Sequence, residues 1–134
     1  MEAERVIHMG ELAFNPPISA QIDIPWIAEK WSRYAKFLLL KDNDKIAATL
    51  VFYENKEGKF IYIPHLVVMN DYQHMGIGHY ALNSLISLIG SEYLCIRLEV
   101  RKDNIQARKF YKNENFIEIE NRENSYILEK KIND

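Results

Sequence analysis

The chain has 134 residues and a formal net charge of -2, with 48% hydrophobic and 27% charged residues. This length suits one hydrophobic core, so we expect residues 1–134 to form a single domain. The weak negative charge argues against a protein that binds nucleic acid by neutralising phosphates. No apolar run reaches the length that crosses a bilayer, so we expect no membrane partner. Cys95 is the single cysteine, which excludes an internal disulfide and a cysteine-based zinc cluster.

The first half of the chain predicts a helix followed by an antiparallel meander. Residues 1–5 lack the apolar core of a signal peptide, from which we expect a cytoplasmic protein. A break at Asn15-Pro16-Pro17 precedes a helical stripe at 24–34, in which Pro25 suits the first turn. Apolar segments separated by turn residues then predict strands at 35–40, 45–53 and 59–69.

Pro64 interrupts the third of these strands. Proline has no N–H to donate to a sheet ladder, so it indicates an edge, a bulge or a local split in the pairing. The disruption is expected just before the glycine-containing turn at 73–78.

The second half predicts a crossover, a helix and a closing hairpin. Apolar residues at helical spacing predict a helix from about Gly76 to Ile89, followed by a strand at 94–100. Strand, helix and strand together predict a parallel, right-handed crossover. Asn104 is a good N-cap for a helix to about Glu114, and strands are expected at 116–120 and 125–130.

The run QHMGIG at 73–78 lies between an apolar strand and an amphipathic helix. The first N–H groups of a helix have no partner within it and form an anion site. Glycines without Cβ atoms let a phosphate approach the backbone. The run is not a P-loop, because no Gly-Lys-Ser/Thr follows, and it lacks the third glycine of a dinucleotide fingerprint. We expect it to hold a phosphorylated cofactor; an ordinary strand-to-helix turn is the alternative.

The strand at 94–100 places polar residues on one face. A polar face is unusual in a covered sheet, so a cleft is expected there. Glu99 lies on this face, either as a functional carboxylate or as a solvated one paired with Arg97 or Arg101. Cys95 is expected to be a buried strand residue.

Two segments in register resemble the GCN5-related N-acetyltransferase (GNAT) family. The run at 73–78 matches the family's Q/R-x-x-G-x-G/A motif, and Asn104 to Tyr111 matches its N-x-x-A-x-x-F-Y segment. The resemblance covers roughly residues 35 to 130. It implies the GNAT fold of the α/β class: a central mixed, mostly antiparallel sheet with a β-α-β crossover and flanking helices. It also implies an acyltransferase that uses acetyl-CoA as co-substrate.

The resemblance assigns a role to each matching position. The backbone of Leu66, Val67 and Val68 would pair with the pantetheine arm of acetyl-CoA, in a slot opened by the split beside Pro64. Asn104 would touch that arm or cap its helix. The remaining cofactor-binding positions implied are Gln73, His74, Met75, Gly76, Ile77, Gly78, His79, Ala107 and Tyr111, of which His74 to His79 would cradle the pyrophosphate with their N–H groups.

The catalytic roles implied are a base and an acid. Glu99 has a spacing to Asn104 and Tyr111 similar to the ribosomal-protein alanine N-acetyltransferases, where the equivalent glutamate accepts a proton. Only a neutral amine attacks a thioester, so a carboxylate is needed directly or through water. His65 is the rival base, although it is expected more often as a packed histidine. Tyr111 would protonate the leaving thiolate or, alternatively, only pack its helix. The N–H of Val67 is a candidate donor to the oxyanion.

Three departures from the family pattern are visible. Met75 stands where a basic residue is common, so one contact to phosphate is lost. Asn115 replaces the usual glycine after the tyrosine helix, a mild change because asparagine tolerates the left-handed conformation. The segment near Pro16 differs from that of the enzymes that acetylate protein N-termini, which leaves the acceptor open.

We expect direct transfer of acetyl from acetyl-CoA to a primary amine in a ternary complex. The acceptor classes are a protein α-amine, an amino sugar, a polyamine or an antibiotic. The alternative is an acyl-CoA-binding sensor or partner module without catalysis. No metal is expected, because no His/Asp/Glu group has ligand spacing. The strands after Phe116 offer pairing between subunits of a homodimer.

Overall fold

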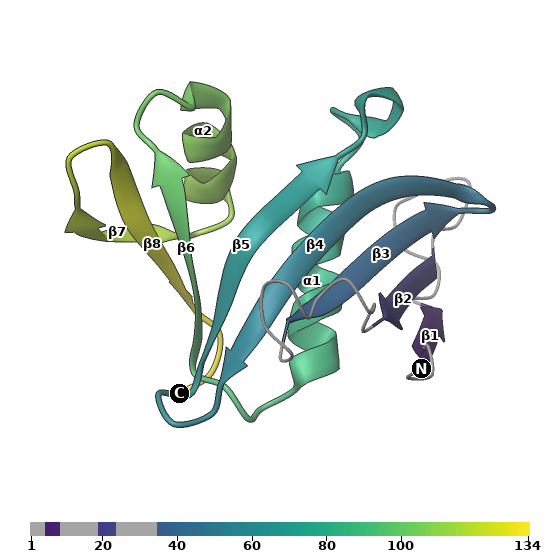
Figure 1. The fold of residues 1–134 in the computed structure, drawn as a ribbon, viewed down its shortest axis with the longest axis horizontal. Coiled ribbons are helices and arrows are strands. Elements are labelled where there is room, and N and C mark those ends of the chain that lie inside the picture. Colours follow the sequence, from purple (N-terminus) through teal and green to yellow (C-terminus); the bar gives the residue numbers. More distant parts are fainter. Residues whose placement is uncertain (1–4, 9–18, 24–34) are drawn as a thin grey trace. The chain divides into compact units, whose positions relative to one another are not determined.

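The computed structural model describes the backbone of residues 5–8 and 19–23 and all of residues 35–134 (Figure 1). The predicted helix at 24–34 and the predicted break at 15–17 lie outside the described residues. The described elements, in chain order, are β1 (Arg5–His8), β2 (Ser19–Asp23), β3 (Lys36–Asp42), β4 (Lys45–Asn55), β5 (Phe60–Val68), the 3-10 helix η2 (Asn70–Tyr72), α1 (Ile77–Ile89), β6 (Cys95–Arg101), α2 (Ile105–Asn113), β7 (Ile117–Asn121) and β8 (Ser125–Lys131).

The chain divides into two units. The first comprises Met1–Tyr53 and His65–Leu88, and the second comprises Glu54–Pro64 and Ile89–Asp134. The division therefore crosses β5 directly after Pro64, the residue that was predicted to disrupt this strand. The expectation of a single domain stays a prediction.

In the first unit, β1, β2, β3 and β4 follow one another as an antiparallel meander (Figure 1). The strands predicted at 35–40 and 45–53 are confirmed as β3 and β4. β1 and β2 were not predicted. They have four and five residues, too few to show a clear apolar alternation.

The core of the first unit forms between strands and one helix. Leu38 and Leu50 are cross-strand partners and fully buried. β4 is buried on both faces, since the consecutive residues 50–52 are all buried. α1 confirms the predicted helix and turns one apolar side inward, with these buried members: Ile77, Tyr80, Ala81, Leu82, Ser84, Leu85 and Ile89.

In the second unit the strand order is β5, β6, β8, β7. β5 and β6 are parallel, whereas β6–β8 and β7–β8 are antiparallel, so the pairing is mixed as expected. The predicted crossover and closing hairpin are thereby confirmed; the crossover's handedness stays a prediction. Leu94, predicted as the start of β6, lies just before the strand and is exposed. Its N–H donates to the carbonyl of Lys59, and its carbonyl accepts from the N–H of Ile132.

α2 ends in the way its sequence suggests. Asn115 follows the helix with φ of 71°, the left-handed conformation that asparagine tolerates better than most residues. The N–H of Phe116 then donates to the carbonyl of Tyr111 over 3.0 Å. This closure returns the chain to a buried Phe116 at the start of β7.

Candidate active site

The parallel pairing of β5 stops where proline interrupts the strand. Its register with β6 runs from Phe60 opposite Cys95 to Ile63 opposite Leu98 and goes no further. Pro64 follows immediately, and it has no N–H to continue the ladder. The predicted disruption at Pro64 is therefore confirmed as an end of pairing.

The segment after β5 bends sharply before α1 begins. His74 has φ of 65° and Gly76 has φ of 77°, so two left-handed residues alternate with ordinary ones within three positions. Glycine is needed at 76 because a Cβ there would be strained. Gly78 is instead the second residue of α1 and has no positive φ, so its conformation alone does not require glycine. The N–H of Tyr80 makes the helical bond to the carbonyl of Gly76, and the N–H groups of Ile77 and Gly78 belong to the first turn, which has no acceptor inside a helix.

Three hydrogen bonds hold this bend within the first unit. The N–H of Met69 donates to the carbonyl of Ala47 over 2.9 Å. The side-chain amide of Gln73 donates to the carbonyl of Val68 over 3.2 Å. The hydroxyl of Tyr72 donates to Asp42 over 2.8 Å. The bend is therefore tied both to the end of β5 and to the β3–β4 hairpin.

The last residues of β5 and the bend leave several side chains outside the core. Val67 is 41% exposed and Met75 47% exposed, while Leu66 and Val68 are half-buried. His74 is exposed, and the ring of His79 lies 2.8 Å from the side-chain amide of Asn83.

His65 lies on β5 of the first unit. Its Nε2 is 3.0 Å from the hydroxyl of Thr49 on β4, and the side chain is half-buried. This matches the expectation of a hydrogen-bonded histidine, and its role as rival base stays a prediction.

Glu99 in the second unit contacts the closing hairpin. Ser125 donates a short hydrogen bond to its Oε2, and Arg122 places a guanidinium nitrogen 3.6 Å from the same oxygen. The pairing that was considered for it, with Arg97 or Arg101, is absent among the described residues. Arg97 instead forms an ion pair with Glu129 on β8 over 2.8 Å, and Arg101 forms one with Asp103.

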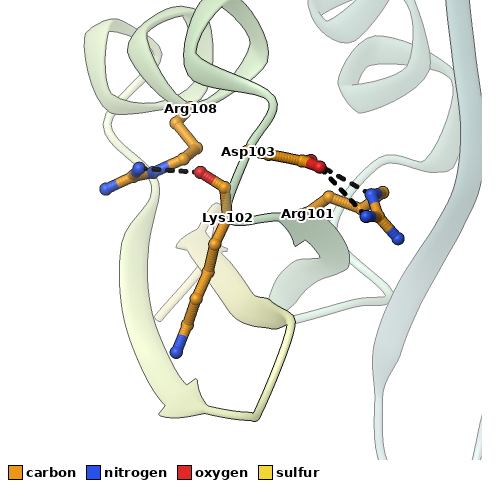
Figure 2. Close-up of polar contacts among 4 residues, drawn as sticks. All are labelled: Arg101, Lys102, Asp103 and Arg108. Atoms are coloured by element: carbon orange, nitrogen blue, oxygen red, sulfur yellow. Dashed lines mark hydrogen bonds and ion pairs between the residues drawn. The ribbon is translucent and has the colours of Figure 1, made fainter.

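Figure 2 shows the ion pair between Arg101 and Asp103, in which two guanidinium nitrogens each lie 3.0 Å from a carboxylate oxygen. The same figure shows Arg108 on α2 donating to the carbonyl of Lys102 over 3.0 Å. Both contacts stabilise the connection between β6 and α2. The Arg101 guanidinium beside Asp103 also lowers the pKa of that carboxyl group.

A cavity of about 340 Å³ borders Glu99 within the second unit. Its lining comprises Tyr62, Pro64, Glu99, Arg101, Asn124 and Ser125. Burial, and then the charge of Glu99, raise the pKa of Tyr62 above its usual range, while Arg122 lowers it. The predicted cleft on the polar face of β6 is thus present as an aromatic and polar cavity with a carboxylate at its wall.

Asn104 caps α2. Its side-chain oxygen accepts from the N–H of Ala107 over 3.1 Å, and its carbonyl accepts from the N–H of Arg108 over 3.0 Å. One of the two roles expected for Asn104 is therefore confirmed. Contact with a pantetheine arm stays a prediction, as does the one for Ala107.

Tyr111 is buried on α2, at 9% exposure. Its ring packs edge-on against Phe110 and Phe116, with centroids 5.1 and 5.2 Å away. Burial raises the pKa of Tyr111 to about 12. The phenol therefore keeps its proton over the whole ordinary pH range. The packing role is visible, and the acid role stays a prediction.

Comparison with known proteins decides the family. The model of the acetyltransferase (GNAT) family matches residues 7–116. The chain belongs to the GNAT family. It is therefore an acyltransferase of the N-acetyltransferase class, whose acetyl donor is acetyl-CoA.

Solved structures share this GNAT fold. The ribosomal-protein-S18-alanine N-acetyltransferase from Escherichia coli is 25% identical, with a TM-score of 0.67 over 81% of this chain and 79% of that one. PaiA N-acetyltransferase from Thermoplasma acidophilum, solved with coenzyme A, is 21% identical, with a TM-score of 0.64 over 79% and 75%. A GNAT acetyltransferase from Elizabethkingia anophelis, solved with acetyl-CoA, is 16% identical, with a TM-score of 0.66 over 78% and 81%. Comparison with curated proteins gave no significant match.

The predicted site residues of this GNAT chain fall into two groups. His65, Leu66–Val68 and the bend at 73–79 belong to the first unit, while Glu99, Asn104, Ala107 and Tyr111 belong to the second. Ser125 and Arg122, which contact Glu99, were not predicted. The alternation of side chains along β8 assigns Ser125 to one of the two faces of the strand. Only the register between β6 and β8 shows that this is the face that carries Glu99.

A metal ion and a membrane were both expected to play no part in the function of this chain. Across the described residues, no cluster of three or more His, Cys, Asp or Glu side chains is arranged to hold a metal ion. None of the helices in the same part of the chain combines the length and apolarity needed to cross a membrane.

Proposed function

We propose that the chain moves the acetyl group of acetyl-CoA to a primary amine by direct attack in a ternary complex. The observation that carries this proposal is the bend between β5 and α1, with its two left-handed residues and the first turn of the helix behind it. The E. coli structural relative is named for acetylating an alanine, an α-amine, and two others were solved with coenzyme A or acetyl-CoA.

The bend suits a diphosphate on electrostatic grounds. N–H groups at a helix start point along the axis, and the helix dipole adds partial positive charge there. The left-handed Gly76 has no Cβ to obstruct a phosphate at this position of the backbone. We assign the pyrophosphate of acetyl-CoA to the N–H groups of residues 74–79, with Met75 supplying no charge.

The end of β5 suits an extended chain. Leu66–Val68 follow the point where pairing with β6 stops, so their backbone has amide groups that an added strand would use. We assign the pantetheine arm to them, with Asn104 and Ala107 as further contacts. The N–H of Val67 is the proposed donor to the oxyanion.

Amine attack requires a proton acceptor. A lysine amine has an ordinary pKa of about 10.4 and an α-amine about 8, so both are largely protonated at neutral pH. We assign the acceptor role to Glu99 at the wall of its cavity, directly or through water, and keep His65 as the rival. The amine nitrogen bonds to the carbonyl carbon, its proton passes to the base, and the carbon–sulfur bond then breaks.

The departing sulfur requires a proton donor, and we assign Tyr111. With a pKa of about 12, Tyr111 always has a proton to give. It is also a weaker acid than a thiol of ordinary pKa of about 8.5. Proton transfer from the phenol to a free thiolate is therefore uphill, so we place it together with cleavage of the carbon–sulfur bond. The phenol proton passes to the sulfur as that bond breaks, and a proton from solvent then restores Tyr111.

The proposal is tested by release of coenzyme A with a panel of amines: an alanine-terminated peptide, an amino sugar, a polyamine and an aminoglycoside antibiotic. We expect turnover with at least one of them. Glu99→Gln is expected to lower kcat/KM most at low pH, where the amine is least often neutral, and little at high pH. If kcat/KM falls by the same factor at every pH, Glu99 is not the base. If no amine gives turnover, the alternative function, an acyl-CoA-binding sensor, replaces the enzyme.

Glu118→Gln is the matched control, because it removes the same charge from an exposed position on β7. Its pH profile is expected to follow the wild type. A cytoplasmic location and a homodimer paired through the strands after Phe116 are kept as proposals from the sequence.

A further inference from the structure

Two side chains of the described residues contact the carboxylate of Glu99, and both contacts are at Oε2. Ser125 donates a hydrogen bond to this oxygen, and Arg122 forms an ion pair with it. The two contacts differ in kind. Ser125 is 7% exposed, whereas Arg122 is half-exposed and its guanidinium nitrogen is 3.6 Å away.

The strand register explains why Ser125 reaches this oxygen. On β6 and β8, Glu99 is opposite Ile127 and Arg101 is opposite Ser125. Directly paired residues share a face, so Ser125 is the diagonal neighbour of Glu99 on the same face. The serine is therefore positioned by two strands, while Arg122 comes from the turn before β8.

Among the described residues, the elements around this carboxylate carry other charged or titratable side chains. On β6, Arg97 is committed to Glu129 of β8, and Arg101 is committed to Asp103. On the β7–β8 hairpin, Arg122 contacts Glu120 more closely, at 2.7 Å, than it does Glu99. On β5, Tyr62 lines the same cavity. Exposed ion pairs of this kind contribute little, so the buried hydroxyl is the stronger anchor.

We propose that Ser125 is a positioning residue for the reaction: its hydroxyl fixes Oε2 of Glu99 and thereby leaves Oε1 to receive the proton of the acceptor amine. This inference rests on the proposed base role of Glu99. Ser125 itself exchanges no proton with the substrate. It keeps the carboxylate oriented, because the hydrogen bond holds Oε2 beside the strand that carries the serine.

The first test compares kcat and KM of Ser125→Ala with those of the wild type. Loss of the hydroxyl is expected to lower kcat about tenfold with little change in KM, because the base is no longer held in one orientation. Ser125→Thr restores a hydroxyl and is expected to bring kcat back toward the wild type. Ser84→Ala removes another buried hydroxyl, bonded to the carbonyl of Tyr80, and is expected to leave kcat unchanged.

Arg122→Gln separates the two anchors and is expected to lower kcat less than Ser125→Ala does. A larger loss with Arg122→Gln, or no loss with Ser125→Ala, would overturn the proposal. If Ser125→Ala does not fold, Ser125→Cys replaces it, and this weaker donor is expected to give an intermediate loss of kcat.

A second readout does not depend on turnover. Carbon-13 NMR of the glutamate carboxyl groups, with Glu99→Gln to identify the signal, follows the carboxyl directly. Its chemical shift is expected to change in Ser125→Ala even if no tested amine is acetylated, which keeps this inference distinct from the proposed function. An unchanged signal would refute the contact, whereas a changed signal with an unchanged kcat would refute the catalytic consequence.

Discussion

The hydroxyl of Tyr72 donates to Oδ2 of Asp42 across 2.8 Å, and this bond ties η2 to the end of β3. The other carboxylate oxygen of Asp42 is buried, and no group in the described part of the chain hydrogen-bonds to it. The hydrogen bond to Asp42 is also the first cause of the raised pKa of Tyr72. The bend that we assign to the diphosphate therefore depends on a contact 30 positions earlier in the chain.

Tyr72→Phe is expected to loosen this bend. The variant keeps the ring but removes the donor, so Oδ2 of Asp42 loses its hydrogen bond, while Oδ1 already has no partner among the described residues. We expect a lower melting temperature and severalfold weaker binding of coenzyme A, measured by calorimetry. Tyr126→Phe, which keeps its ring beside Arg108 in the second unit, is the control. Unchanged affinity in Tyr72→Phe would separate the Asp42 contact from the cofactor site.

Gly76→Ala and Gly90→Ala form a matched pair. Both glycines have a positive φ, 77° and 66°, one just before α1 and the other just after it. A Cβ in the left-handed conformation costs roughly 1–2 kcal/mol, so both variants should lose similar stability. Only Gly76→Ala is expected to weaken coenzyme A binding. The dissociation constant should rise about tenfold, which corresponds to about 1.4 kcal/mol of binding free energy. Equal affinities in the two variants would argue against a phosphate at the start of α1.

Tyr111→Phe tests the proton donor. We expect kcat to fall about a hundredfold or more, the usual contribution of a positioned acid, with little change in the dissociation constant of coenzyme A. The ring packing against Phe110 and Phe116 is retained in this variant. Steady-state release of coenzyme A gives kcat, and calorimetry gives the dissociation constant. If kcat is unchanged, Tyr111 has only the packing role.

The raised pKa of Tyr111 also predicts how stability changes in alkali. Its pKa is about 12 in the folded chain and about 10 in an unfolded one, so the folded state holds the proton more tightly. The resulting stabilisation is complete below pH 10 and is lost as the pH rises toward 12. Denaturant unfolding at these two pH values should show that the free energy of unfolding falls by roughly 2 kcal/mol less in Tyr111→Phe than in the wild type. Equal losses would mean that the phenol is accessible to water in the folded chain.

Much of the site was predictable because local sequence determines local geometry. Pro64 marked the end of the β5–β6 pairing, since a missing N–H cannot be supplied by any tertiary contact. Gly76 marked the left-handed position before α1, and Asn104 marked the cap of α2. The short strands β1 and β2 escaped prediction, because so few residues show no periodicity of their own.

The sequence by itself determined the order of the strands and α-helices from β3 onward, though not the 3-10 helix η2, and the motifs that identify the GNAT family, because apolar periodicity, proline and glycine act within a few residues. Only the tertiary structure decided which groups contact Glu99. Arg97 and Arg101 are nearer in sequence, yet Ser125 and Arg122 contact it, because the register of β8 against β6 sets the cross-strand neighbours. The burial that raises the pKa of Tyr111 was decided in the same way, by Phe116 folding back beside it after the helix ends.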